Sequence, residues 1–174
     1  NGRSVAQTFQ DGLEAVLGCR PDIKGCSRTD AGVHALGFML NFHADTRIPV
    51  EKLPLALNQH LPPDIRVLAA RVVPEDFHAR YAAHTKTYLY RIHNSPIDSP
   101  FDEKYYTRVP RRLDTAKMNT AARRFVGKHD FLALCAAGSS AAAHGDTVRT
   151  ITACGVERKG DEVEITVTAD GYLY

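Results

Sequence analysis

The residues of this sequence best suited to chemistry lie together in the polar segment 27–34. This segment contains the acid Asp30, the base Arg28, the imidazole of His34 and the conformationally free Gly32. Arg28, two residues before Asp30, could pair with its carboxylate and keep it ionised, which suits a nucleophile or a base. The segment could instead be an Asx-turn, in which Asp30 caps its own backbone and Gly32 adopts a positive φ. On these residues alone the turn is the favoured explanation, because Asp-x-Gly turns are common.

The elements that must position this segment are predicted from hydrophobic spacing. Ser4 is suited to cap a helix whose apolar side chains recur at helical spacing until Gly18. The first part of the chain is predicted to contain helices over 5–17 and 50–60 and extended segments over 23–26, 36–43 and 65–73. The polar segment is therefore expected to be a loop between two extended segments, where reactive groups tend to lie.

The second part of the chain has longer strands. The pattern predicts strands over 85–92, 105–109, 148–156 and 163–169 and a helix that begins at Asp114 or Thr115 and ends at Gly127. Alternation places Tyr88, Tyr90 and Ile92 on one face of their strand, and residues 159–161 suit a hairpin turn. Because helices and strands do not alternate regularly, we expect an α+β fold with a mainly antiparallel sheet.

The composition indicates a globular chain that needs no disulfide, metal or cofactor. With 174 residues and 44% hydrophobic content, the chain can bury a core of its own. The four cysteines form no C-x-x-C pair, and the eight histidines form no recognised ligand motif. No apolar run approaches the roughly 20 residues of a membrane helix, and no secretory signal is visible in this stretch. We therefore expect no membrane association and a cytoplasmic location.

Positive charge is concentrated in one block, although the net charge is only +2. Residues 104–128 contain eight basic side chains against the single acid Asp114. Such a block would attract phosphates, and a solvated helix face balanced by acids elsewhere explains it equally well. The basic residues are Lys104, Arg108, Arg111, Arg112, Lys117, Arg123, Arg124 and Lys128.

The string Arg-Thr-Asp-Ala-Gly-Val-His-Ala at residues 28–35 resembles, without a gap, the signature of the tRNA pseudouridine synthase A family. Further similar segments follow in the family's order along nearly the whole chain: 2–7, 58–65, 77–81, 86–90, 127–131 and 147–151. The resemblance implies the pseudouridine synthase fold, a mixed, mainly antiparallel sheet flanked by helices in two similar halves with a cleft between them. It places the catalytic loop in residues 1–75 and the active-site tyrosine in residues 76–174.

The resemblance implies an isomerase, an intramolecular transferase that converts uridine to pseudouridine in the anticodon stem-loop of tRNA. Asp30 would be the essential carboxylate, either bonding covalently to the sugar or the base or acting as a proton-removing base. Arg28 would hold the nucleotide out of its stack and pair with Asp30, because a stacked base cannot expose the bond being broken. Tyr88 would stack on the extruded uracil, although it could instead be a cross-strand core aromatic.

Three more residues are candidates for contact with the RNA: His34, Arg80 and Lys86. His34 could instead tie the loop to a strand, and the two cations could be solvent-facing strand ends. Asp130 is expected to be a cap and Phe131 a core residue rather than catalytic groups. The Ala- and Ser-rich stretch 138–145 is expected to be a mobile surface loop.

The sequence also departs from the family pattern at both ends. No strand carrying Tyr-Asp-Gly precedes residue 1, and the helix that begins with Asn-Met-Val-Arg is absent after residue 174. We therefore expect an incomplete piece of an enzyme that forms a homodimer when full length. Two rival functions remain: a non-catalytic RNA-binding module, suggested by the aromatic segment 37–42, and a small-molecule enzyme that uses Asp30 and His34 for acid–base chemistry.

Overall fold

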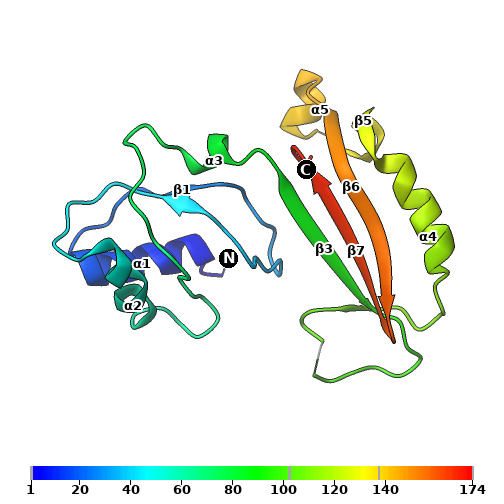
Figure 1. Ribbon diagram of the computed structural model, residues 1–174, viewed down its shortest axis with the longest axis horizontal. Helices are drawn as coiled ribbons and strands as arrows, with labels where there is room; N and C mark the ends of the chain where they lie inside the picture. The colour runs from blue at the N-terminus through cyan, green and yellow to red at the C-terminus, as the bar shows by residue number, and fades with distance from the viewer. Residues whose placement is uncertain (1, 102, 137, 174) are drawn as a thin grey trace. The chain divides into compact units, whose positions relative to one another are not determined.

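The computed structural model describes residues 2–101, 103–136 and 138–173. They form two compact units, unit 1 (Asn1–Ala83) and unit 2 (His84–Tyr174). Unit 1 contains helices and a two-stranded ladder, and unit 2 contains a five-stranded sheet with a helix beside it (Figure 1). The predicted α+β class is confirmed. The assignment of separate roles to residues 1–75 and 76–174 stays a prediction.

Helix α1 (Val5–Leu17) begins and ends where the sequence predicted. At its start the Ser4 hydroxyl accepts a hydrogen bond from the Gln7 backbone N–H at 3.2 Å, which satisfies one of the unpaired donors of the first turn. At its end Gly18 has φ 70°, a left-handed conformation that closes the helix and that glycine adopts without strain.

The core of unit 1 forms between α1 and the next helical segment. That segment consists of the 3₁₀ helix η1 (Val50–Lys52) and helix α2 (Leu53–Asn58), and it confirms the second predicted helix. Its buried side chains are Phe9, Leu13, Leu53, Leu57 and Leu61. Gly12 allows Leu61 to pack closely against α1, since a Cβ there would lie 3.0 Å from Leu61 Cδ2.

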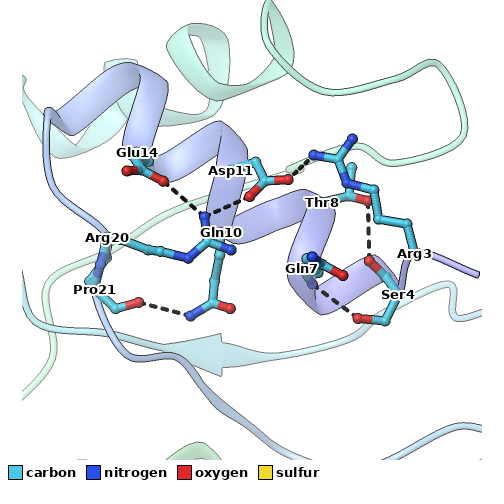
Figure 2. Close-up of polar contacts among 9 residues, drawn as sticks. All are labelled: Arg3, Ser4, Gln7, Thr8, Gln10, Asp11, Glu14, Arg20 and Pro21. Carbon is cyan, nitrogen blue, oxygen red and sulfur yellow. Dashed lines mark hydrogen bonds and ion pairs between the residues drawn. The ribbon is translucent and has the colours of Figure 1, made fainter.

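Polar contacts fold the chain that follows α1 back onto the helix, as Figure 2 shows. The Arg20 guanidinium lies 2.6 Å from Asp11 Oδ1 and 2.9 Å from Glu14 Oε2, and Arg3 also pairs with Asp11. The Gln10 side-chain amide donates to the Pro21 carbonyl at 3.2 Å. Each exposed ion pair contributes at most about 1 kcal/mol, but together they fix the direction in which the chain leaves α1.

Two extended segments of unit 1 differ from the prediction. Only Leu40–Asn41 (β2) of the predicted strand 36–43 is paired, with β1 (Lys24–Gly25), because the preceding residues form a loop. The strand predicted over 65–73 is wrong, since no ladder forms there among the described residues. The Asn58 side chain takes the place of a partner strand, accepting from Val67 N–H at 2.8 Å and donating to Val67 O at 2.9 Å.

Unit 2 is built on a sheet with strand order β4-β3-β7-β6-β5. Its strands are β3 (Lys86–His93), β4 (Thr107–Arg108), β5 (Gly127–Asp130), β6 (Val148–Lys159) and β7 (Glu162–Ala169). All neighbours are antiparallel except β3 and β4, so the predicted mainly antiparallel sheet is confirmed. The predicted hairpin is also confirmed, with Gly160 at φ 65° in its turn.

Helix α4 (Thr115–Ala122) lies along β6 and continues as the 3₁₀ helix η2 (Arg123–Phe125), as Figure 1 shows. The Asp114 carboxylate caps it by accepting from Lys117 N–H at 3.0 Å. The Asn119 amide donates to the carbonyl of Val156 at 2.6 Å and accepts from its N–H at 2.9 Å. These two bonds satisfy backbone groups on the side of β6 that faces away from β7.

A buried asparagine joins the chain that precedes α4 to the β6–β7 hairpin. Asn94 is 7% exposed, and its amide nitrogen donates to Val109 O and Arg111 O at 2.7 and 2.8 Å. Its side-chain oxygen accepts from Leu113 N–H at 3.0 Å and from the Arg158 guanidinium at 2.7 Å. The chain that enters α4 is therefore fixed through one side chain.

Two expectations for residues 130–145 have different outcomes. Asp130 is a cap, as predicted: it accepts from Leu132 N–H at 3.0 Å, and a hydrogen bond from Thr147 lowers the pKa of its carboxyl group. The mobile loop expected over 138–145 is wrong, because Ser140–His144 forms helix α5 between the capping residues Ser139 and Gly145. Short capped alanine-rich segments favour a helical turn.

In the described residues, no helix combines the length and apolar character needed to cross a bilayer.

Candidate active site

The loop that carries Asp30 is closed at its base by the β1–β2 ladder. Cys26 N–H donates to Met39 O at 2.9 Å, directly beyond the pairing of Gly25 with Leu40. The ring of Phe38 packs against Gly25, where a Cβ would lie 3.0 Å from Phe38 Cζ. Glycine at this position therefore allows the two sides of the loop to approach each other.

Asp30 lies at the first position of a tight turn in this loop. Val33 N–H donates to Asp30 O at 3.2 Å, and Gly32 has φ 82°, which matches the third position of a type II turn. The positive φ expected at Gly32 is therefore present, but the side chain of Asp30 does not cap the turn. Within the described part of the chain, the exposed Asp30 carboxylate has no hydrogen-bond or ion-pair partner. The turn consequently presents a carboxylate that local structure does not use.

The other candidates in the loop are also on its surface. Arg28 and His34 are both exposed. The expected ion pair between Arg28 and Asp30 does not form among the residues that the structure describes. The guanidinium and the carboxylate thus lie in one loop without neutralising each other, which leaves the cation available for a phosphate or a base.

Arg80 lies on a helix that is attached to the same ladder. Helix α3 (Ala79–Ala82) is fixed by Asn41, whose side chain accepts from Ala79 N–H at 2.8 Å and donates to Phe77 O at 3.1 Å. Asn41 belongs to β2, so the Asp30 loop and Arg80 share one anchor within unit 1. The Arg80 side chain is exposed, as a phosphate contact requires.

Lys86 and Tyr88 belong to unit 2, where both lie on β3 and are partly buried. The ladder places Tyr88 opposite Val167 and places Val167 opposite Cys154, so these three residues form one row across the sheet. Burial raises the pKa of the Cys154 thiol. In the described residues the Tyr88 hydroxyl has no hydrogen-bond partner, so it is available to a ligand.

Tyr172 is a neighbour of Tyr88 that the sequence reasoning missed. The two ring centroids are 4.6 Å apart with an interplanar angle of 76°. Burial, Tyr88 and Cys154 together raise the pKa of Tyr172 to about 12. No periodicity in the sequence places residues 171–173 over β3.

The candidate residues thus fall into two groups, one in each unit. Unit 1 holds Arg28, Asp30, His34 and Arg80, and unit 2 holds Lys86 and Tyr88. In the described residues, no group of three or more His, Cys, Asp or Glu side chains is arranged to hold a metal ion. Unit 1 therefore offers an exposed carboxylate and exposed cations for chemistry, and unit 2 offers a half-buried tyrosine.

Comparisons with known proteins give the family. Residues 2–82 and 121–174 match the model of the family described as tRNA pseudouridine synthase. A tRNA pseudouridine synthase A of Thermoanaerobacter sp. (strain X514) is 40% identical over 174 residues, which are 100% of this chain and 70% of that protein.

Two other relatives of the same name are similar. The protein of Ruminiclostridium cellulolyticum is 41% identical over 175 residues, covering 100% of this chain and 70% of the relative. That of Halalkalibacterium halodurans is 41% identical over 173 residues, covering 97% and 65%. The family match spans both units and includes the Asp30 loop and Tyr172. This chain belongs to the tRNA pseudouridine synthase family, a family of isomerases that convert uridine to pseudouridine in tRNA.

Proposed function

We propose that Asp30 is the catalytic carboxylate with which this chain isomerises uridine to pseudouridine in tRNA. The observation that carries the proposal is the exposed carboxylate of Asp30, which has no partner among the described residues and lies in the part of the chain that matches the family. A carboxylate committed to a cap or an ion pair would have to break that contact before reacting. Asp30 has no such contact to lose.

The reaction needs one nucleophile or base and no external reactant. The bond between uracil N1 and ribose C1′ breaks, the uracil turns, and its C5 bonds to C1′; the C5 proton leaves to solvent and N1 takes up a proton, so that the product is an isomer of the substrate. Asp30 could assist in two ways, by bonding covalently to the sugar or the base or by removing a proton. Both ways require the nucleotide to leave its stack, because the carboxylate cannot reach the bond inside a helix.

We assign the remaining candidates to holding the extruded nucleotide. Tyr88 stacks on the uracil, and its unpartnered hydroxyl can assist proton transfer. Arg28, Arg80 and Lys86 contact phosphates, since none of them forms an ion pair with a described residue. His34 contacts the RNA from the same loop as Asp30.

The charge distribution of unit 2 supports a polyanionic substrate. Acids of its sheet are paired with cations of the same sheet: Glu162 and Glu164 with Arg91, and Glu164 also with Lys159. In the basic block, only Arg108 and Lys117 bond to described residues, namely to Pro96 O and Asp114. Six exposed cations have no partner within the described part of the chain: Lys104, Arg111, Arg112, Arg123, Arg124 and Lys128. Unneutralised cations attract phosphates.

The first prediction concerns Asp30→Asn in the full-length protein. We expect tRNA binding to stay within about twofold, because the amide has nearly the same shape, and pseudouridine formation to fall at least about 1,000-fold. Release of tritium from uracil C5 measures the reaction, and filter binding measures affinity. Asp45→Asn, which changes another exposed acid of unit 1, should retain full activity.

Other outcomes would favour the rival functions. An unaltered protein that binds tRNA but forms no pseudouridine would be an RNA-binding module. An unaltered protein that does not bind tRNA would favour a small-molecule enzyme. An Asp30→Asn variant with normal activity would exclude Asp30 as the catalytic group.

The second prediction concerns the turn under Asp30. Gly32 has φ 82°, so Gly32→Ala is strained by about 1 kcal/mol, whereas asparagine tolerates this region better. We expect the rate of pseudouridine formation to rank Gly32 above Gly32→Asn above Gly32→Ala, with little loss of thermal stability because the loop is exposed. Gly37→Ala is the control, since Gly37 lacks a positive φ and a Cβ there meets nothing within 4 Å. Equal rates for all three Gly32 proteins would mean that the turn does not position the reacting group.

The third prediction concerns the basic block. Replacing both Arg123 and Arg124 by alanine should weaken tRNA binding and reduce the slope of log affinity against log salt by about 1 to 2, since each lost phosphate contact removes about 0.7 to 0.9. Lys117→Ala is the control on the same helical segment, because its ammonium is already paired with Asp114. A slope that is unchanged by the double substitution would show that these arginines do not contact phosphates.

The fourth prediction concerns the substrate region and the assembly. Following the resemblance to the synthase A family, we propose the anticodon stem-loop as the target, a homodimer as the full-length assembly and the cytoplasm as the location. Chemical mapping of pseudouridine in treated tRNA should give modification in the anticodon arm, and light scattering should give twice the monomer mass. Modification confined to another arm, or a monomer at the concentrations used in the assay, would contradict the corresponding proposal.

A further inference from the structure

The ring of Tyr172 packs against the ring of Tyr88 on β3. The centroids lie 4.6 Å apart and the planes meet at 76°, an edge-to-face arrangement. Aromatic pairs prefer this geometry because the positive edge of one ring meets the negative face of the other. The orientation of each ring therefore depends on the other.

The hydroxyl group of Tyr172 is bound to the backbone of the sheet. It donates to Val167 O at 2.7 Å, and Lys86 O lies 3.3 Å away. Val167 is the ladder partner of Tyr88, and Lys86 precedes Tyr88 by two residues on β3. The Tyr172 ring is thus fixed at its far end to β7 and to β3, the strand that carries Tyr88.

The chain that leads to Tyr172 is also fixed. After β7, Asp170 N–H donates to Thr150 O at 3.1 Å, and the Asp170 carboxylate accepts from Thr150 N–H at 2.9 Å. Gly171 then passes close to Arg149, where a Cβ would lie 3.0 Å from Nε and 3.1 Å from Cδ. The two hydrogen bonds of Asp170 and the close approach of Gly171 to Arg149 therefore fix the position of the backbone that leads into Tyr172.

We propose that Tyr172 is a positioning residue that fixes the Tyr88 ring in the orientation needed to contact the target uracil. The inference rests on the proposed function, in which Tyr88 stacks on that base. Tyr172 acts through Tyr88 and not on the substrate, since its hydroxyl proton is already committed to a backbone carbonyl. Its raised pKa agrees with this role, because burial and the neighbouring Tyr88 keep the phenol neutral.

Substitutions in the full-length protein test the role of the ring and of the hydroxyl separately. Tyr172→Leu removes the ring and should lower the single-turnover rate by about 10- to 100-fold, as expected when a reacting group is misplaced by about 1 Å. Tyr172→Phe keeps the ring, loses the bond to Val167 and should cost about fivefold. Affinity for tRNA should change less than about twofold in both. Tyr90 lies on β3 with Tyr88, and its hydroxyl is bonded to Thr107 on β4; Tyr90→Phe removes that bond and should leave the rate unchanged.

A double-mutant cycle with Tyr88→Leu separates positioning from other roles. If Tyr172 acts through Tyr88, Tyr172→Leu should slow the Tyr88→Leu protein by less than twofold. Rate losses that multiply would overturn the inference and leave the proposed function intact. Full activity of Tyr88→Leu would instead refute the role of Tyr88 in the proposed function.

Thermal denaturation checks that the variants are folded. If Tyr172→Leu unfolds, Tyr172→Phe replaces it in the cycle. This variant keeps the ring and removes the hydroxyl that bonds to Val167 O, so it tests whether that bond positions Tyr88. A Tyr172→Phe protein with an unchanged rate and an unchanged dependence on Tyr88 would overturn the positioning role of the hydroxyl anchor.

Discussion

Side-chain amides that occupy the place of a neighbouring strand hold much of this chain together. An asparagine can accept from one backbone N–H and donate to one backbone C=O, which is the pattern that a paired strand would provide. Asn58 does this at Val67 and Asn119 at Val156, each through two bonds to a single residue. Asn41 and Asn94 join segments distant in sequence in the same way. Without these amides, the backbone groups they satisfy would have to find water or another partner.

Several acids of the chain already have partners. Asp114 caps α4, Asp130 accepts from Leu132 N–H, and Glu164 on β7 pairs with Arg91 and Lys159. Asp30 makes no such contact with a described residue, because its turn is closed by backbone atoms and by the left-handed conformation of Gly32. A turn that needs no side-chain cap can offer its carboxylate to a substrate.

Local patterns predicted the elements that local chemistry determines. The Ser4 cap, the Gly18 stop and the hairpin around Gly160 were predicted because each depends on a few neighbouring residues. The strand over 65–73 was wrong because apolar residues such as Leu68, which is 80% exposed, indicate a strand only when a partner is available. The loop predicted over 138–145 was wrong because Ser139 and Gly145 cap a short helix there, whereas an Ala- and Ser-rich composition alone indicates a flexible segment. Tyr172 could not be found from spacing, since its contact with Tyr88 depends on pairing between β3 and β7.

The row of side chains that contains Tyr88 also contains a sulfur atom. Cys154 lies two strands away in the same row, and its partly buried thiol has a raised pKa. Because the thiolate is the form that reacts with oxidants and electrophiles, a thiol that stays protonated near neutral pH reacts slowly. Cys154 is therefore a slowly reacting side chain in the row that contains Tyr88, where it fills space as a small apolar group.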